Sequence, residues 1–549
     1  MADRVIIVGA GPVGMTLALD LARRGVPSLI LEQRDADAPA HPKCNTISAR
    51  SMEIFDILGC ADDMREVGLP ADYTNDVVYS TSYANGHEIA RLSLPSRARR
   101  WSDDRFALDG EWPSAQRPHR ASQIFLERVL RKHVLANDMI ELRFSSTVVA
   151  ADEQADGVVV SWEEGGDTHK VKAPYVAGCD GGRSFVRRAM DVSLVGISAV
   201  KTRIWAAYFR SKKLLKAGPK GGVWMNFFIQ ENQRGTLVAI DGIETWLIHC
   251  NVPPGLDYDE FDWRAGVGTL LGADVDFDLI AAEKWRLNRA VAEKYRAGRF
   301  FLAGDAAHIW PPFAGFGMNS GVEDAFGLSW MLAAVLKGQA SEQLLDAYEA
   351  ERKPVGELVS HAADGMVAEQ RAAASAGGLQ KDVRRTDKQG ELARTTIGRN
   401  ILRIDSQQFD PQGLNFGIAY ESSPAVVYDG EAAPAFVVRQ YTPTTVPGCR
   451  APYFVFADGV HLYERLGPDL TLLRTNPDVD VSAFVDAAKE RRVGLKVIDI
   501  GHEPKARPIY DRALVLVRHD QRICWRGETA DEAGTVLAQI LGERSGSGS

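Results

Sequence analysis

Three glycines near the start of the chain have the spacing of a phosphate-binding turn. Gly9, Gly11 and Gly14 form G-x-G-x-x-G, and Pro12 stands where a helix could begin. The first glycine makes the tight bend, the second lets backbone N–H groups approach a pyrophosphate, and the third lets helix pack on strand. The positive end of the helix then faces the phosphates. This pattern predicts a dinucleotide site that includes these four residues.

The acid that follows the second strand narrows the choice of dinucleotide. Glu32, followed by Gln33, lies 18 residues beyond Gly14, close to the roughly 20 at which an acid reaches a ribose hydroxyl in this type of fold. Because a carboxylate there disfavours a 2′-phosphate, FAD or NAD is expected rather than NADP. The elements that position the turn are expected to be a strand, a helix and a second strand, over Val5–Val8, Met15–Arg24 and Ser28–Leu31.

Two further motifs place an acid after a buried strand. Asp180 and Gly181 follow one such strand, and Asp305 follows another. An acid in this position can hydrogen-bond ribityl hydroxyls. A glycine-rich turn, residues 311–321, then leads into a helix expected over Val322–Leu336, whose first N–H groups can face an anion.

Composition excludes several classes of protein. The chain has 549 residues, 25% charged and 45% hydrophobic, which is typical of a soluble globular protein, and its length predicts two to four domains. A net charge of −9 argues against a nucleic-acid partner. No apolar run approaches the roughly 20 residues that a membrane span needs. Six separated cysteines without a C-x-x-C pair indicate reduced thiols, no metal site and a cytoplasmic location.

Strand and helix patterns divide the chain into layers. Alternating aromatic and β-branched residues at 192–285 predict an antiparallel sheet with one buried face, and residues 371–392 are expected to be a mobile helical linker. A last α/β unit includes strands expected at Tyr453–Phe456, Leu470–Leu473, Leu495–Asp499 and Ala513–Val517. The expected division is residues 1–75, 118–190 and 286–400 for cofactor binding, 76–117 and 191–285 for substrate binding, 410–543 for the last unit, and 544–549 as a flexible tail.

Taken together, the glycine turn, Asp180-Gly181 and Gly304-Asp305 resemble the class A flavoprotein aromatic hydroxylases over about residues 1–400. The resemblance implies an α/β fold: a Rossmann-type FAD-binding domain with an inserted antiparallel substrate sheet. Residues 447–452, 462–466 and 524–527 resemble the C-terminal thioredoxin-like domain of the phenol-hydroxylase branch, without its redox pair. By this resemblance the flavin-contacting residues also include Arg50, Gln123, Asp305, Pro312, Gly315, Gly317, Met318 and Asn319.

The resemblance also implies the reaction. Non-covalent FAD, reduced transiently by NADPH or NADH in the same cleft, would react with O2 to a C4a-hydroperoxide that hydroxylates a phenolic or related aromatic substrate. The thioredoxin-like domain would have a structural or dimerisation role, which predicts a homodimer. A Baeyer–Villiger or epoxidising enzyme of the same fold stays open as the alternative. A plain NAD dehydrogenase does not explain the two acid motifs, and the W-x-W-x-I-P signature of flavin halogenases is absent from the sequence.

The expected catalytic residues depart from the family at one position. Phenol hydroxylase has an aspartate five residues before the loop arginine, where this chain has Asn45. An amide cannot take the phenol's proton, so the substrate is already acidic, another group serves, or deprotonation is not needed. The candidates on the aromatic sheet are Tyr83, Tyr208 and His249. With Pro312 of the flavin loop, Asn45, Tyr208 and His249 form the predicted catalytic set.

Overall fold

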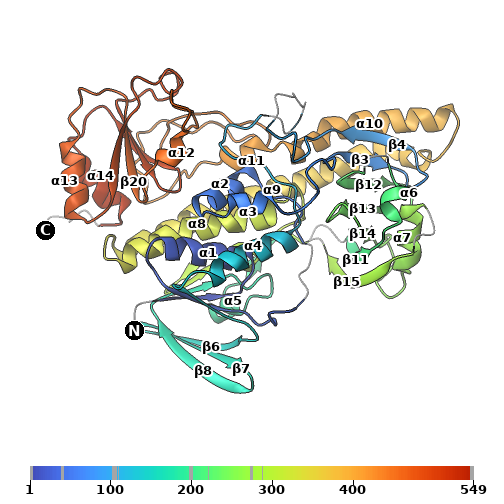
Figure 1. Cartoon of the computed structure of the whole chain (residues 1–549), viewed down its shortest axis with the longest axis horizontal. Helices are drawn as coiled ribbons and strands as arrows, with labels where there is room; N and C mark the ends of the chain where they lie inside the picture. Colours follow the sequence, from blue (N-terminus) through green and yellow to red (C-terminus); the bar gives the residue numbers. More distant parts are fainter. Residues whose placement is uncertain are drawn as a thin grey trace.

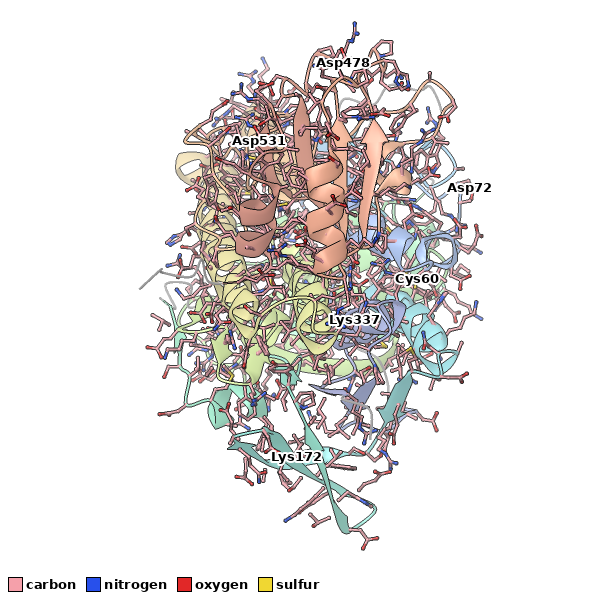
Figure 2. The ribbon with its side chains drawn as sticks, turned by 90° about the vertical axis from the view of Figure 1, so that its left-hand side faces the viewer. Cys60, Asp72, Lys172, Lys337, Asp478 and Asp531 are labelled. Carbon is pink, nitrogen blue, oxygen red and sulfur yellow. The ribbon has the colours of Figure 1, made fainter. Side chains whose placement is uncertain are left out.

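A computed structural model describes most of the chain as a six-stranded first sheet, a seven-stranded second sheet and a C-terminal unit, connected by long helices. In Figure 1 one sheet lies to the right, a C-terminal sheet lies to the upper left, and helices α8 and α9 run between them. Figure 2 shows sheet β6–β8, which carries Lys172, at the opposite end from the C-terminal unit with Asp478 and Asp531. The described residues are 4–38, 43–101, 108, 111–196, 202–219, 222–272, 276–286 and 288–543, so the predicted tail lies outside them.

The first sheet has six strands in the order β17-β18-β9-β1-β2-β5. The strands β18, β9, β1, β2 and β5 pair in parallel. Continuous buried apolar runs form its centre, as expected for a sheet covered on both faces. Their carboxyl ends share one edge, which brings the three sequence motifs together. The strands are β1 (Val5–Val8), β2 (Ser28–Leu31), β5 (Ile140–Arg143), β9 (Val176–Gly178), β17 (Arg296–Ala297) and β18 (Phe300–Leu302).

The second sheet, in the order β15-β11-β14-β13-β12-β3-β4, confirms the expected aromatic layer. Its pairs are antiparallel except that β3 runs parallel to β12. One face packs on apolar side chains from α7 and α10 and the loops. The strands are β3 (Val77–Ser80), β4 (Glu88–Leu92), β11 (Arg203–Arg210), β12 (Met225–Ile229), β13 (Arg234–Ala239), β14 (Thr245–Asn251) and β15 (Asp278–Arg286).

Three long helices connect the layers, and two expectations about them were wrong. Helix α8 (Phe316–Leu336) begins six residues before the expected Val322, because Gly315 adopts a left-handed conformation (φ 69°) that starts the helix inside the glycine-rich turn. Residues 371–392 are not a linker. They include the end of α9 (Asp346–Ser375), a 3₁₀ turn and the start of α10 (Lys388–Phe409), whose apolar side chains join the core of the second sheet.

The C-terminal unit has the order β21-β20-β22-β23, with β20 and β21 parallel and the other two pairs antiparallel. This is the α/β arrangement that the thioredoxin-like resemblance implies. The expected strand at Tyr453–Phe456 is wrong, since only Val455 forms an isolated bridge there. The elements are β20 (Leu470–Arg474), α13 (Ser482–Glu490), β21 (Leu495–Asp499), β22 (Leu514–Arg518), β23 (Ile523–Gly527) and α14 (Ala533–Ile540).

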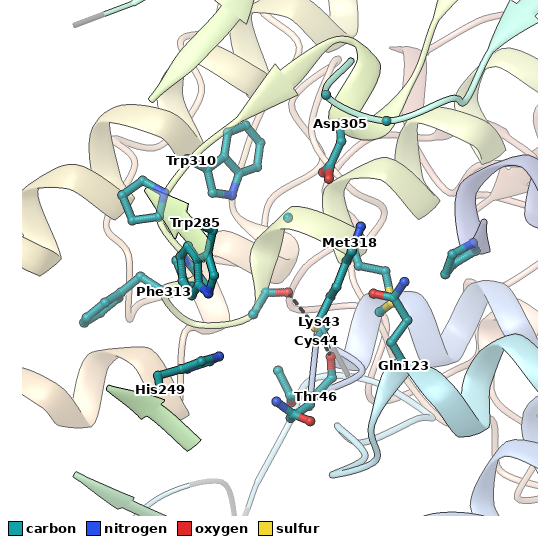
Figure 3. Close-up of a pocket in the computed structure, with 18 of the residues that line it drawn as sticks. Lys43, Cys44, Thr46, Gln123, His249, Trp285, Asp305, Trp310, Phe313 and Met318 are labelled. Carbon is teal, nitrogen blue, oxygen red and sulfur yellow. Dashed lines mark hydrogen bonds between the residues drawn. The ribbon is translucent and has the colours of Figure 1, made fainter. Parts of the chain in front are cut away.

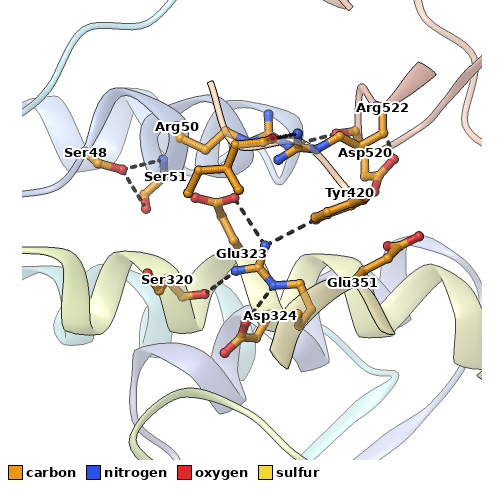
Figure 4. A network of polar contacts seen from close by, with 12 residues as sticks. Ser48, Arg50, Ser51, Ser320, Glu323, Asp324, Glu351, Tyr420, Asp520 and Arg522 are labelled. Atoms are coloured by element: carbon orange, nitrogen blue, oxygen red, sulfur yellow. Dashed lines mark hydrogen bonds and ion pairs between the residues drawn. The ribbon is translucent and has the colours of Figure 1, made fainter. Parts of the chain in front are cut away.

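Ion pairs between buried side chains join the C-terminal unit to helices α9 and α2 (Ala49–Ile57). The Arg518 guanidinium donates to the Glu351 carboxylate of α9 (2.9 Å) and to Asp520 (2.7 Å). Arg450 bonds Glu53 of helix α2. Figure 4 shows part of this network, in which Arg352 bonds Asp324 and Arg50 bonds the Asp520 carbonyl, with Glu351 near them. We call it the interface network. Each carboxylate of the network has a cationic partner.

The remaining elements complete the framework. Among the residues that the structure describes, no helix is both long and apolar enough to cross a membrane. These elements are α1 (Pro12–Arg23), α2 (Ala49–Ile57), α3 (Ala61–Arg65), α4 (Gln123–Leu135), β6 (Thr147–Gln154), β7 (Gly157–Glu164), β8 (Asp167–Ala173), α5 (Phe185–Ala189), β10 (Leu194–Val195), α6 (Leu214–Ala217), α7 (Trp263–Leu271), β16 (Ala290–Ala292), β19 (His308–Ile309), α11 (Gln412–Phe416) and α12 (Leu462–Arg465).

Candidate active site

A single cavity of about 1140 Å³ connects the first sheet to the second. Its volume exceeds the roughly 300–1,000 Å³ of a site for one small molecule, so it has room for a cofactor and a substrate. The end of the cavity at the glycine turn, which we call the turn end, is lined by the loops that follow the first-sheet strands and by the start of α8. The opposite end, which we call the sheet end, is lined by the second sheet and by α9 and α10. Figure 3 shows Asp305, Met318 and Gln123 on one side and His249 and Trp285 on the other.

The glycine turn has the geometry that its sequence predicts. A side-chain carbon on Gly9 (φ 103°) would lie 2.5 Å from the Cys179 carbonyl oxygen, and one on Gly14 would lie 2.1 Å from the Gly9 oxygen. Gly11 faces open space in the cavity. Helix α1 begins at Pro12 with no acid in its first turn. The helix end is therefore free to bind a phosphate, while Gly14 lies behind the turn and packs helix on strand.

Glu32 is fixed at the end of β2 with its carboxylate against the turn. One oxygen accepts from the Ala10 N–H (2.8 Å) and the other from the Arg34 N–H (2.9 Å). Glu32 and Gln33 both line the cavity, and so does Gln123, whose amide donates to Glu127 (2.7 Å). Glu32 thus lies against the glycine turn, where an acid that contacts a ribose would have to be.

The turn that carries Asp305 is supported by a buried carboxylate. Asp324 accepts from the Gly304 N–H (3.0 Å), His308 Nε2 (2.8 Å) and the Arg352 guanidinium (2.7 Å). Burial alone would raise the pKa of Asp324, but the charges of Arg352 and His308 hold it at about 2. The ionised carboxylate thus holds the turn in place, and the Asp305 side chain stays exposed in the cavity.

The loop at the start of α8 is tied to residues 44–48. The Asn319 amide donates to the Gly315 carbonyl (2.6 Å) and the Thr46 carbonyl (3.1 Å), and its oxygen accepts from the Ser48 N–H (2.8 Å). Asn319 is buried behind the cavity wall, so it positions the loop and does not line the site. Pro312, Gly315, Gly317 and Met318 do line it.

Three further residues that the sequence analysis singled out lie outside the cavity wall. Arg50 is outside the cavity wall because its guanidinium is buried in the interface network, where it bonds Glu53 (3.0 Å) and the Asp520 carbonyl (2.8 Å). Tyr208 shares the cavity-facing side of β11 with Ile204, but four residues along a strand is about 13 Å, which places it beyond the cavity. Tyr83 also lies outside, packed edge-on against Trp246.

Unpartnered polar atoms point to a missing ligand. Asp180 accepts from the Phe185 N–H (2.6 Å) with one carboxylate oxygen, while the other is buried without a hydrogen-bond partner among the described residues. The side-chain oxygen of Asn45 is likewise buried and has no hydrogen-bond partner among the described residues. Both residues line the cavity. Buried oxygens without partners are costly, so a bound group that supplies hydrogen-bond donors would fit these two positions. With the open glycine cradle, the turn end fits a dinucleotide.

The sheet end is aromatic. Thr236 of β13 pairs with Phe227 on one side and with His249 on the other. The Phe227 ring stacks on Tyr79 (centroids 5.0 Å apart), and His249 meets the Trp285 ring edge-on (5.3 Å). Burial lowers the pKa of His249 to about 4, so the imidazole is neutral at pH 7. This wall suits a flat aromatic molecule.

A tyrosine–aspartate pair that sequence reasoning missed lies at the same end. The Tyr79 hydroxyl donates to Asp405 of α10 (2.5 Å), and the Gln370 amide donates to the same oxygen (2.8 Å). Burial raises the pKa of Asp405 to about 6, against these two hydrogen bonds. Tyr79 and Gln370 line the cavity, and Asp405 stands behind them. The pair joins residues 326 positions apart, and no local pattern announces it.

Comparisons with known proteins agree with this site. The FAD binding domain family matches residues 3–363. The FAD-dependent monooxygenase apdD of Emericella nidulans is 30% identical over 98% of this chain and 90% of its own length. Phenol 2-monooxygenase of Pseudomonas sp. strain EST1001 is 28% identical over 98% and 92%.

Solved structures give the same result for the fold. RebC with bound 7-carboxy-K252c superposes with a TM-score of 0.88 at 29% identity, covering 99% of this chain and 100% of that one. Aklavinone-11 hydroxylase with FAD and aklavinone gives 0.79 at 26% identity, over 98% and 99%. The family match covers the glycine turn, both acid motifs and the start of α8, and we conclude that the chain belongs to the FAD binding domain family and is a flavin-dependent monooxygenase.

Proposed function

We propose that the enzyme uses NADH or NADPH and O2 to hydroxylate a large, planar phenolic substrate. The observation that carries this proposal is one cavity that runs from a dinucleotide cradle to an aromatic wall. Reduced FAD would supply the chemistry that activates O2 and delivers one oxygen atom. A second glycine turn of the G-x-G-x-x-G type is absent from the sequence, which favours a nicotinamide reductant that binds the same cleft transiently.

The residues at the turn end would hold FAD through distinct groups. The first N–H groups of α1, with Gly11, would bind the pyrophosphate, and Glu32 would accept from the ribose. Asp305 would accept from the ribityl hydroxyls because its carboxylate is exposed in the cavity. The N-terminus of α8, which has no side-chain cap, would offer N–H groups to negative charge on the flavin.

The size and lining of the sheet end favour a polycyclic substrate over a simple phenol. Phe227, Trp285 and His249 present ring faces and edges there. Among the relatives are a putative polyketide hydroxylase of Streptomyces coelicolor, 30% identical over 65% of this chain, and the aklavinone-11 hydroxylase complex. These names support a multi-ring substrate for this chain.

Tyr79 and Asp405 would accept the substrate's proton. A phenol beside Tyr79 would give its proton to the tyrosine oxygen while the tyrosine hydroxyl proton passes to the Asp405 carboxylate. The substrate then becomes a phenolate, Asp405 becomes neutral, and no proton leaves the site. A pKa of about 6 leaves Asp405 mostly ionised and ready at pH 7. His249 is less suited, because its pKa of about 4 lets it accept a hydrogen bond but not hold a proton. Asn45 would orient the substrate hydroxyl.

A substrate screen tests the reaction. Phenols, hydroxybenzoates and hydroxylated polycyclic quinones are added to the holoenzyme, and NAD(P)H oxidation is measured together with incorporation of oxygen-18 from labelled O2. We expect the polycyclic compounds to stimulate oxidation and to gain one labelled hydroxyl. Lactone or epoxide products would replace the proposal with the Baeyer–Villiger or epoxidising alternative, and a lack of stimulation by any aromatic would contradict both.

A pH profile tests the proton acceptor. Removing a general base costs about 100-fold or more, so Tyr79→Phe and Asp405→Asn should lower kcat and remove the rise of kcat/KM near pH 6. A nitrophenol that is already ionised should restore turnover of both variants. Tyr208→Phe makes the same change outside the cavity and should leave the profile unchanged. A normal profile for Tyr79→Phe would exclude the pair.

Three coarser expectations accompany this function. All six cysteines are free thiols, which supports a reducing compartment such as the cytoplasm. A homodimer stays a prediction, to be checked by sedimentation at working concentration. The division into a discontinuous FAD-binding part, an inserted substrate part and a C-terminal part is our proposal for the folding units, and limited proteolysis of the holoenzyme tests its boundaries.

A further inference from the structure

Two arginines face the sheet end of the cavity from opposite walls. On β13, Arg234 alternates with Thr236 and Val238, which all line the cavity, so the three side chains share one face. On α9, Arg371 lies with Val367, Gln370 and Ala374 at the spacing of one helix face, and these also line the cavity. The two cations therefore converge on the same space.

Neither arginine is neutralised by a residue that the structure describes. Among the described residues, Arg234 has no hydrogen-bond or ion-pair partner for its side chain, and Arg371 donates only to the Thr202 hydroxyl (2.6 Å). Asp364, two turns earlier on α9, affects Arg371 through its charge without forming an ion pair. Burial lowers the pKa of both guanidinium groups, and their mutual repulsion lowers that of Arg234 further. Both stay charged, so an anion between them would remove a repulsion.

The carboxylates of the cavity are all at the other end. Those that line it come from the turn end, and no carboxylate lines the sheet end among the described residues. The carboxylates of the turn end are Glu32, Glu127, Asp180 and Asp305. The turn end carries both signs of charge, since Arg34, Arg183 and Arg188 also line the cavity, whereas the sheet end carries the unpaired charges of Arg234 and Arg371. Asp405 lies behind the wall of the sheet end, where it accepts from Tyr79 and Gln370. A guanidinium fork matches a planar carboxylate by two parallel hydrogen bonds.

We propose that Arg234 and Arg371 form a binding site for a carboxylate on the aromatic substrate. The proposal rests on the proposed function, since it assumes that the sheet end holds the substrate. It narrows the proposed aromatic substrate to one that carries a carboxylate, and it names the two side chains that would bind it. The pyrophosphate of NAD(P)H is the other source of an anion in this cleft, and the experiment separates the two.

Binding is measured on the FAD-loaded enzyme by the change in flavin absorbance. The probes are 3-hydroxy-2-naphthoate and a hydroxyanthraquinone carboxylate, each beside its methyl ester, which keeps the rings and removes the charge. The variants are Arg234→Gln, Arg371→Gln and the conservative Arg234→Lys. Arg264→Gln, on the surface helix α7 outside the cavity, is the matched control. FAD content and melting temperature show that each variant is folded.

We expect wild-type enzyme to bind the acids at least tenfold more tightly than the esters. Either Gln variant should weaken acid binding ten- to a hundredfold and ester binding less than threefold, with the lysine variant in between. Equal losses for acid and ester, or no preference in the wild type, would overturn the carboxylate site. A rise only in the KM for NAD(P)H would assign the arginines to the reductant. If the esters alone are hydroxylated, the proposed function stands and this inference fails.

Discussion

The ligand cavity and the interface network are both rich in buried polar groups, but they balance them differently. In the network, Arg518 bonds Glu351 and Asp520, and Arg352 bonds Asp324. In the cavity wall, an oxygen of Asp180 and one of Asn45 are buried without a partner among the described residues, and Arg234 and Arg371 form no ion pair with them.

Paired charges hold the layers together, whereas Arg234 and Arg371 have no partner of opposite charge in the described part of the chain. The contrast extends to pKa values. Asp324, next to Arg352 and His308, has a pKa of about 2, although burial opposes this. Asp405, equally buried but next to a tyrosine and an amide, has a pKa of about 6. A carboxylate that serves structure is held ionised, and one that can serve chemistry is tuned toward neutral pH.

The largest effect is expected from breaking the network. Glu351→Ala leaves the Arg518 charge buried with only Asp520 beside it and removes the acceptor of the Ser423 hydroxyl (2.6 Å). Removing one partner of a buried pair costs about 3–5 kcal/mol. Urea unfolding at pH 7 should show this loss. Glu357→Ala breaks the exposed pair with Lys353 and should cost less than about 1 kcal/mol. Equal midpoints for the two variants would remove the distinction between network and surface.

The next effect concerns Asp405 and its pH dependence. Its pKa rises from 3.8 to about 6 on folding, so the folded state binds the proton more tightly. The contribution of Asp405 to stability is therefore greatest below about pH 4, falls as pH rises to about 6, and is constant above. The change is about 3 kcal/mol. As pH rises through this window, the wild type loses this stability and Asp405→Asn does not, so the melting temperature of the variant should increase relative to that of the wild type. A difference independent of pH would mean that the carboxylate titrates normally.

Cofactor affinity gives the third effect. Asp305→Ala removes a charge-assisted acceptor from the ribityl hydroxyls, worth about 1.5–3 kcal/mol, or roughly ten- to a hundredfold in FAD affinity. Because Asp305 is exposed and unpaired, stability of the protein without FAD should not change. Fluorescence titration with FAD measures the affinity, and Asp531→Ala on the far surface is the control. Unchanged affinity would move the ribityl site elsewhere in the cavity.

Local patterns predicted the turn end well because its residues are close in sequence. The β1 strand, the glycine turn, α1 and Glu32 lie within 30 positions and depend on backbone geometry that glycine spacing encodes. Helix α4 likewise begins directly after Ser122, whose side chain caps it by accepting from the Ile124 N–H, which is again a local signal.

The failures involve distant partners. Arg50 matched a family position, but its guanidinium binds residues more than 460 positions away, which no local pattern contains. The Tyr79–Asp405 and Arg234–Arg371 pairs are assembled by α9 and α10 packing across the second sheet. Tyr208 lies on the expected sheet and on the face of β11 that points to the cavity. The pairing register of the strands decides which part of β11 reaches the cavity, and the sequence does not contain that register.

The smallest effect is expected in the C-terminal unit, where the sequence predicts no redox pair. Burial raises the pKa of Cys524 to about 12 and that of Cys449 to about 11, so both are protonated and unreactive at pH 7. Cys524 donates to the Leu516 carbonyl over a long distance (3.4 Å), so the loss of this weak bond in a serine variant costs little. Cys524→Ser and Cys449→Ser should therefore leave substrate-stimulated NAD(P)H oxidation within about twofold of wild type and cost about 1 kcal/mol of stability or less.

Cys44 makes the comparison sharper, because it carries the same raised pKa of about 11 but lies in the cavity wall. Its thiol donates to the Thr46 carbonyl (3.2 Å) beside the start of α8, as Figure 3 shows. A shorter C–O bond cannot reach both this carbonyl and that of Gly315, so Cys44→Ser should shift the loop and weaken FAD binding several-fold while the two C-terminal variants do not. A tenfold loss of turnover in Cys449→Ser or Cys524→Ser, with normal FAD content, would instead give the C-terminal unit a part in the chemistry.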